Sequence, residues 1–340
     1  DRRNHFYRFP GVDNSTDKTL SAMLRMAVIA QTQEAFEKAP AETDEQRAAK
    51  AAQEGLVKQL FVELKRDFKP SDLPPYTLVK LGMHLANTSQ PEESIAYFDE
   101  ILDPSEPNPV RKQARINGMS KYRKNAVFGK AVALGRSKDN AKVDTAIKMM
   151  RDELSKEESS SNPDRKAMED AQYNLVKFTA ARQDWPAVIA AAEKYRADKS
   201  YKKNLPEVLF LQGQAYLKQN EPDKALVCFM NITGADYKGL VKWSAPAMLA
   251  QMDTLWNRNK MSQGTGKQPS DRYVAWRTGS QYVQLLDTPA NRKRMTAEDS
   301  DLLNQVKDKV SRFGSDPAVS QERSDIAAYE AAIRSARGQK

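Results

Sequence analysis

The chain has 340 residues and a formal net charge of +9 at pH 7, with 54 lysine and arginine residues against 45 aspartate and glutamate residues. No stretch approaches the roughly 18 uncharged apolar residues that a membrane-spanning helix needs, so the composition excludes a transmembrane span and indicates a soluble protein. The positive charge leaves nucleic acid, anionic lipid and an acidic protein open as partners. Glycine (14) and proline (17) are sparse, which favours helices.

The first helix is predicted from residue 17 to residue 37, with Ser15 or Thr16 as its cap, and the second from residue 44 to residue 67. A proline-rich stretch, 69–75, then interrupts the helical pattern. We expect residues 1–70 to form a helical pair that packs on the rest of the chain. No segment alternates apolar and polar residues over the length of a strand, so the predicted fold class is all-α.

An internal repeat follows, and its two clearest copies are centred on Gly82 and Gly213. A large residue recurs three positions after each glycine, a small residue twelve positions after it and a phenylalanine sixteen positions after it. These residues are Leu85, Ser94 and Phe98 in the first copy, and Tyr216, Ala225 and Phe229 in the second. The glycine lets two helix backbones approach, and the pairs are predicted to stack because a lone helical hairpin cannot bury both its faces.

This pattern resembles the tetratricopeptide repeat (TPR) family. The resemblance implies a right-handed α-α superhelix of stacked antiparallel helix pairs across residues 71–240. Two good copies occupy the windows 75–108 and 206–239, and two weaker ones, around Ala131 and Trp185, occupy 124–157 and 169–202. The spacing between copies exceeds the family's, which indicates longer helices or loops; generic helical hairpins are the alternative interpretation.

Beyond residue 240 the helical periodicity continues without the repeat pattern. We predict one helix pair from segments 243–259 and 270–286. A last pair, from 296–312 and 320–337, is expected to cap the array, so that residues 241–340 form a C-terminal set of helical pairs.

The resemblance also implies a binding groove on the concave face of the first helices. Carrying the family's groove positions onto this sequence gives Tyr76, Val79, Met83, Phe128, Val132, Tyr173, Lys177, Phe210 and Gln214. Four of them form an apolar or aromatic stripe: Val79, Phe128, Tyr173 and Phe210. This stripe would anchor a peptide if exposed. Neighbouring helices or the terminal segment could instead cover the stripe. The expected function is a protein–protein interaction scaffold that binds a partner peptide or domain.

Cationic residues are dense between Arg111 and Lys148. A basic patch of Lys121, Arg123, Lys124, Lys130 and Arg136 makes nucleic-acid or anionic-polymer binding the alternative function. Such runs are also typical of solvated helix faces. The sequence lacks the glycine-rich motifs with interleaved aromatics that favour base stacking, so protein binding is the favoured hypothesis.

Residues for catalysis are scarce. The two histidines, His5 and His84, are not spaced for a metal site, and the single cysteine, Cys228, lies in an apolar helical run. We therefore expect no metal, no cofactor and no enzymatic activity. The chain starts at Asp1 rather than methionine, which leans toward an exported or periplasmic protein, although a trimmed chain would start in the same way.

Overall fold

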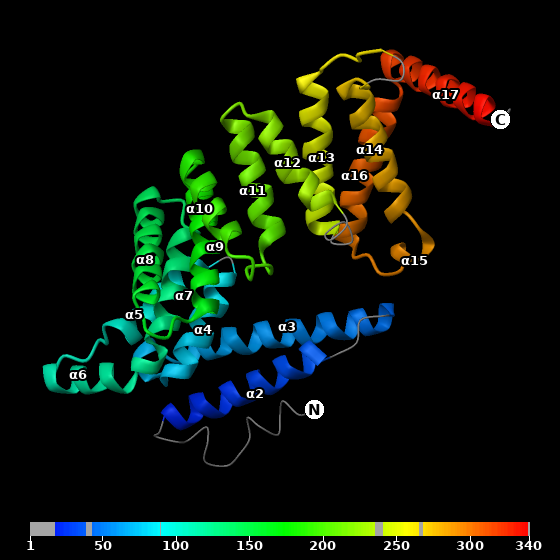
Figure 1. The fold of residues 1–340 in the computed structure, drawn as a ribbon. Helices are drawn as coiled ribbons and strands as arrows, with labels where there is room; N and C mark the ends of the chain where they lie inside the picture. Colours follow the sequence, from blue (N-terminus) through cyan, green and yellow to red (C-terminus); the bar gives the residue numbers. More distant parts are fainter. Residues whose placement is uncertain (1–17, 39–42, 89, 235–240, 265–267, 339–340) are drawn as a thin grey trace. The chain divides into compact units, whose positions relative to one another are not determined.

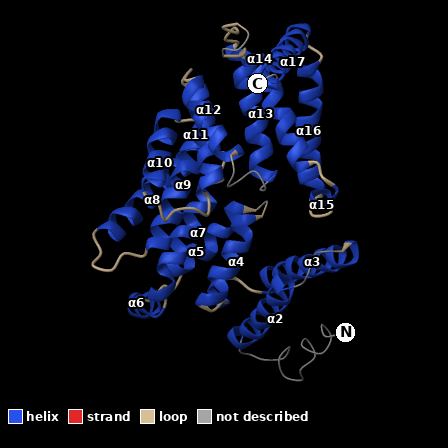
Figure 2. Ribbon diagram, turned by 45° about the vertical axis from the view of Figure 1, so that its right-hand side comes forward, coloured by secondary structure: helices blue, strands red, loops and turns tan. Residues whose placement is uncertain are grey.

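The structure is a computed structural model that describes residues 18–38, 43–88, 90–234, 241–264 and 268–338. Within these ranges the regular structure consists of sixteen α-helices and two 3₁₀ helices, with no strand (Figure 2). The predicted all-α class is confirmed. His5 and the predicted caps Ser15 and Thr16 lie outside the described residues.

The chain divides into two compact units, Asp1–Asn174 and Leu175–Lys340. The first contains α2 (Lys18–Lys38), α3 (Asp44–Asp67), η1 (Pro70–Asp72), α4 (Pro75–Asn87), α5 (Pro91–Leu102), α6 (Pro109–Gly118), η2 (Ser120–Tyr122), α7 (Arg123–Gly135) and α8 (Asn140–Glu158) (Figure 1). The second contains α10 (Trp185–Ala197), α11 (Leu205–Lys218), α12 (Pro222–Thr233), α13 (Val241–Arg258), α14 (Asp271–Leu286), α15 (Pro289–Arg292), α16 (Ala297–Gly314) and α17 (Pro317–Gly338). The boundary falls within α9 (Arg165–Ala181), and the three-part division made from the sequence stays a prediction.

Local signals fix where most helices begin. Thr43 closes a capping box at the start of α3, accepting a hydrogen bond from the Gln46 backbone N–H, and Thr296 does the same for α16 with Asp299. Proline occupies the first position of α4, α5 and α12, where no backbone N–H is needed. These short-range signals are the reason that predicted and observed helix boundaries agree closely.

In the first unit, α2 and α3 lie side by side and share a buried core with α4 and α5. Phe61 and Leu64 of α3, Leu78 and Leu81 of α4 and Phe98 of α5 are members of this core. The second helix of the first repeat, α5, packs against both α4 and α7, and α7 packs against α8.

The two clear repeat copies form the same helical hairpin, α4–α5 and α11–α12. In each, the glycine is a socket for the phenylalanine sixteen residues later. A methyl group built on Gly82 would come within 2.8 Å of the Phe98 ring, and one on Gly213 within 2.5 Å of the Phe229 ring. The glycines therefore do more than let backbones approach, because each receives an aromatic ring.

The structure adds a third glycine to the first of these contacts. A methyl group built on Gly129 of α7 would come within 2.2 Å of the same Phe98 ring, so Phe98 packs against both Gly82 and Gly129. The repeat spacing in the sequence places Ala131 at the reference position of the second copy and does not identify Gly129. In the second unit, Phe229 shares its buried cluster with Ala247 of α13, the helix that follows the hairpin.

Two features of the fold differ from the sequence prediction. The ten-residue helix α6 was not predicted; it buries none of its residues and accounts for part of the long spacing between the first two copies. In addition, α17 does not fold back along α16. The helix α16 packs on α13 and α14, whereas α17 is held mainly at its start, where Val319 is 1% exposed, and projects beyond the other helices of its unit (Figure 1).

Candidate functional site

The predicted groove residues of the first unit differ in exposure. Tyr76 of α4 is 45% exposed, and Lys80 places its ammonium 5.6 Å from the centre of the Tyr76 ring. Met83 of the same helix is half-buried against the first core. The remaining positions, Phe128 and Val132 of α7 and Tyr173 of α9, are also half-buried. Their side chains keep part of their apolar surface open.

Val79 is different, and its prediction as a groove residue is corrected. Its side chain is only 7% exposed and belongs to the core that α2 and α3 build with α4. The N-terminal helices supply large apolar residues such as Met26 and Phe61 to this core. The interpretation that neighbouring helices cover the stripe therefore holds for Val79, the first of its four positions.

In the second unit, the predicted groove positions are Lys177, Phe210 and Gln214. Lys177 forms an ion pair of 3.5 Å with Glu207 of α11. Phe210 is half-buried and its ring centre lies 5.9 Å from that of Phe229. Gln214, one turn further along α11, is exposed. An exposed amide and a half-open aromatic ring on one helix can contact a polypeptide, but they contain no reactive group.

Much of the predicted basic patch is occupied by acidic partners from distant parts of the chain. Lys124 pairs with Glu157 at 2.5 Å and with Asp164 at 3.1 Å. Burial by itself would lower the pKa of Lys124, but its hydrogen bonds to these two carboxylates outweigh that effect and raise the pKa. Lys130 of α7 pairs with Asp99 of α5 at 2.6 Å. These cations link helices of the first unit instead of standing free for a polyanion.

The other members of the patch have different surroundings. The Arg136 guanidinium donates a hydrogen bond to the backbone carbonyl of Ala86, at the end of α4. Lys121 is exposed and lies 4.9 Å from the ring centre of its neighbour Tyr122, and Arg123 is also exposed. Lys121, Arg123 and Arg136 are therefore the exposed members of the five, and of these Arg136 already donates to the Ala86 carbonyl.

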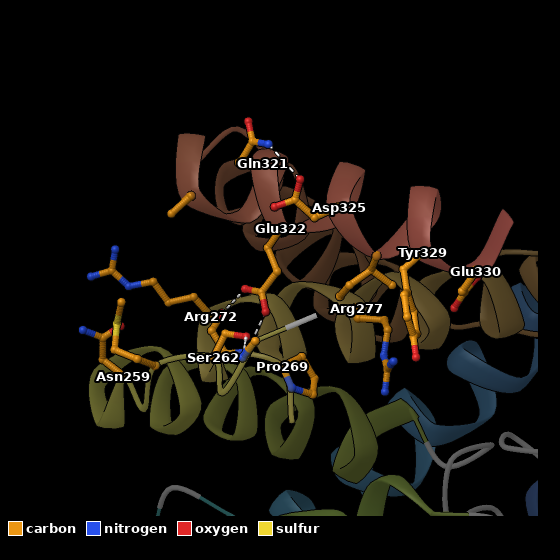
Figure 3. Close-up of a pocket in the computed structure, with 15 residues that line it drawn as sticks. Asn259, Ser262, Pro269, Arg272, Arg277, Gln321, Glu322, Asp325, Tyr329 and Glu330 are labelled. Atoms are coloured by element: carbon orange, nitrogen blue, oxygen red, sulfur yellow. Dashed lines mark hydrogen bonds between the residues drawn. The ribbon is translucent and has the colours of Figure 1, made fainter. Parts of the chain in front are cut away.

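A cavity of about 690 Å³ lies in the second unit between α14, the loop before it and α17 (Figure 3). Glu322 of α17 accepts hydrogen bonds from the backbone N–H and the hydroxyl of Ser270, the residue that caps α14. Arg272 lies with its guanidinium 5.0 Å from the ring centre of Trp256. The polar groups of this cavity hold α17 in place. Its lining contains both arginine and carboxylate side chains, so it has no single sign of charge.

A second cavity, of about 620 Å³, lies in the first unit between α3 and the end of α4. Phe61, Val62 and Leu85 provide its apolar surface. The ring of His84 stacks on Phe61, with the ring centres 4.1 Å apart. Burial, followed by the charge of Lys58, lowers the pKa of His84, so that this imidazole is neutral at pH 7.

Comparison with known proteins assigns no relative. No known protein-family model matches this chain. No curated protein sequence matches it significantly either. The family resemblance thus rests on the residues of the repeat alone.

The described residues hold no group of three or more histidine, cysteine, aspartate or glutamate side chains that could bind a metal ion. Cys228 is buried, and burial raises the pKa of its thiol to about 11, which leaves it protonated at neutral pH. None of the described helices is both long and apolar enough to cross a lipid bilayer.

Proposed function

We propose that this chain is a non-catalytic protein–protein interaction scaffold of the TPR-like kind, which binds a partner peptide or domain through the first-helix face of its repeats. The stacking of its hairpins into a right-handed superhelix is part of this proposal. The observation that carries it is the glycine–phenylalanine contact, which recurs with the same spacing in α4–α5 and in α11–α12. Two separate hairpins with one packing rule are what a repeat array requires.

The binding face is supported by the partial exposure of its apolar residues. Within the first unit, Tyr76 of α4 and Phe128 and Val132 of α7 all retain open surface. Aromatic side chains with both buried and open surface are the residues that contribute most to protein interfaces. Since Val79 is buried, the proposed face of this unit runs along Tyr76, Met83, Phe128, Val132 and Tyr173.

Nucleic-acid binding, the alternative, has weaker support. Lys124 and Lys130 are paired with carboxylates within the unit, and each pair would have to be broken or shared before a phosphate could be bound. Non-specific binding to nucleic acid needs several cations that are free to replace counterions. The exposed members of the patch are Lys121, Arg123 and Arg136, and Arg136 donates a hydrogen bond to the Ala86 carbonyl.

Site-specific photocrosslinking in a native extract tests the proposal. The photoreactive residue benzoylphenylalanine replaces Tyr76 or Phe128 on the first helices, and in the control it replaces Lys148, which is exposed on the second helix α8. We expect the two first-helix positions to yield the same protein adduct and the control position to yield none. Tyr76→Glu should abolish the adduct formed from Phe128. Adducts from Lys148 alone, or from all three positions alike, would contradict the proposal.

A further inference from the structure

The cavity between α3 and α4 has a marked charge asymmetry. Three of its lining residues, Lys58, Lys65 and Arg66, are cations, and the lining contains no carboxylate. Gln90 also faces it, and its side-chain oxygen accepts a hydrogen bond from Lys65 at 3.3 Å, which leaves the amide N–H groups to donate. The hydrogen-bonding groups of this cavity are therefore mostly donors, which suits a ligand rich in acceptors.

The same cavity has an apolar surface. Val62 is 63% exposed, an unusual position for a large aliphatic residue, and it stands one turn before Arg66 and one turn after Lys58 on the same face of α3. Phe61 and Leu85 lie behind it, and the His84 ring closes the wall by stacking on Phe61. An apolar group of the ligand can thus be buried between the cations.

The distance between the cations of α3 indicates which kind of acidic ligand can contact all of them. Lys58 and Arg66 are eight residues apart on α3, which separates them by about 12 Å along the helix axis at about 1.5 Å per residue. One carboxylate, such as the head of a fatty acid, cannot reach both ends. Two carboxylates on either side of an apolar side chain can, because about four residues of an extended peptide span this length.

The existing ion pairs do not prevent such binding. Lys58 pairs with Glu54 at 2.7 Å, with side chains 61% and 49% exposed, and Arg66 pairs with Asp67 at 2.7 Å with its own side chain 70% exposed. Lys65 pairs with Glu93. The Lys58–Glu54 pair and the Arg66 side chain are mostly exposed, and ion pairs of this kind add little to stability, so ligand carboxylates can join or replace these partners at low cost.

We propose that the face of α3 formed by Lys58, Val62, Lys65 and Arg66, together with the end of α4, is a docking site for an acidic peptide segment whose carboxylates flank a bulky apolar side chain. This is a second interaction surface, separate from the first-helix face. The apolar side chain enters between Val62 and Leu85, and the carboxylates lie along the cations of α3.

Fluorescence anisotropy with three labelled hexapeptides tests the proposal on the full-length protein. The probe has a tryptophan–leucine centre with two glutamates on each side; one comparison peptide has lysines in place of the glutamates, and the other has serines in place of the centre. We expect the probe to bind, and each comparison peptide to bind at least about tenfold more weakly, the change that about 1.4 kcal/mol produces. Binding of the probe should also weaken as the salt concentration rises.

Matched variants connect binding to the site. Val62→Glu and Lys58→Glu should each weaken binding of the probe by about tenfold or more, the effect of losing an apolar anchor or reversing a facing charge. The controls are Val110→Glu, at a valine that is 79% exposed on α6, and Lys148→Glu, on α8. These controls should change the affinity less than about twofold. Circular dichroism checks that all four variants fold, as the exposure of the replaced side chains leads us to expect.

The outcomes separate clearly. No binding of the probe, equal binding of the lysine peptide, or equal loss in the control variants would overturn the proposal. If sodium oleate binds in a Val62-dependent manner and the acidic probe does not, the occupant is a lipid-like amphiphile and the proposal is wrong. The variants lie outside the first-helix face, so failure here leaves the photocrosslinking result of the proposed scaffold unaffected.

Discussion

The glycine sockets around Phe98 allow a sharp test of the repeat packing. Replacing Gly129 of α7 with alanine puts a methyl group inside the space of the Phe98 ring, closer than the 2.8 Å found for the same change at Gly82. The Phe98 ring must move, and overpacking of this kind costs about 1–3 kcal/mol. Alanine recovers up to about 1 kcal/mol through its higher helix propensity, so we expect a net loss of up to about 2 kcal/mol for Gly129→Ala.

The control is another helical glycine. Gly55 lies within α3, and a methyl group built on it meets nothing within 4 Å. Because only the propensity effect remains, Gly55→Ala should stabilise the protein by about 0.5–1 kcal/mol. The same substitution in the same type of element should therefore have opposite signs at Gly55 and at Gly129.

Urea unfolding followed by circular dichroism measures both changes. Gly82→Ala and Gly213→Ala should also destabilise, since the methyl groups would lie 2.8 Å and 2.5 Å from a phenylalanine ring. In a Phe98→Leu background the cost of Gly129→Ala should fall, because the smaller side chain leaves room, and a double-mutant cycle reports this coupling. If Gly129→Ala stabilised the protein as Gly55→Ala does, the described socket would be wrong.

Further predictions concern ion pairs and pH. Arg258 donates to both carboxylate oxygens of Asp271 at 2.8 and 2.6 Å, and Asp271 is 4% exposed, so Asp271→Asn should lower the free energy of unfolding by about 3 kcal/mol in the same urea assay. The pKa of His84 is lowered in the folded state, so the unfolded chain binds more protons as the pH falls below the usual pKa of 6.5; stability should decrease below that pH, and His84→Gln should reduce the decrease in thermal unfolding. Charge reversal at Lys121 and Arg123 should leave gel-shift binding to RNA or DNA unchanged at physiological salt.

Each of these has a clear contrary outcome. An unfolding free energy unchanged by Asp271→Asn would mean that the buried pair is not formed in solution. A wild-type protein whose thermal midpoint is constant from pH 7.5 to 5.5 would exclude a shifted His84. Nucleic-acid binding at physiological salt that is lost on charge reversal of Lys121 and Arg123 would favour the alternative function over the scaffold.

Local spacing was enough to predict the helices and the repeat. The predicted segment 44–67 coincides with α3, and the predicted segments 270–286 and 296–312 begin at Ser270 and Thr296, which cap α14 and α16 in the structure. The glycine–phenylalanine pairs were found because both residues belong to one hairpin, at a fixed separation in the chain. Helix α6 was missed because it is short and mostly polar and buries none of its side chains.

The surface could not be predicted in the same way. The exposure of the groove positions depends on which helices approach them, and Val79 belongs to a core that also contains residues of α2 and α3, which no repeat pattern specifies. The basic patch was evident in the sequence, but the partner of Lys130 is Asp99, 31 residues away. The charged cavity between α3 and α4 likewise exists only once the two helices meet.

The sequence by itself therefore determined the all-α class, the helix boundaries and the paired spacing of the repeat, because capping, proline placement and helical periodicity act over a few residues to one hairpin. Only the tertiary structure decided which apolar positions remain open, which cations are neutralised and where α17 goes after α16 ends. These properties depend on contacts between helices that are far apart in the chain. The energy of such contacts comes from packing between helix surfaces, which the spacing of residues along the chain does not specify.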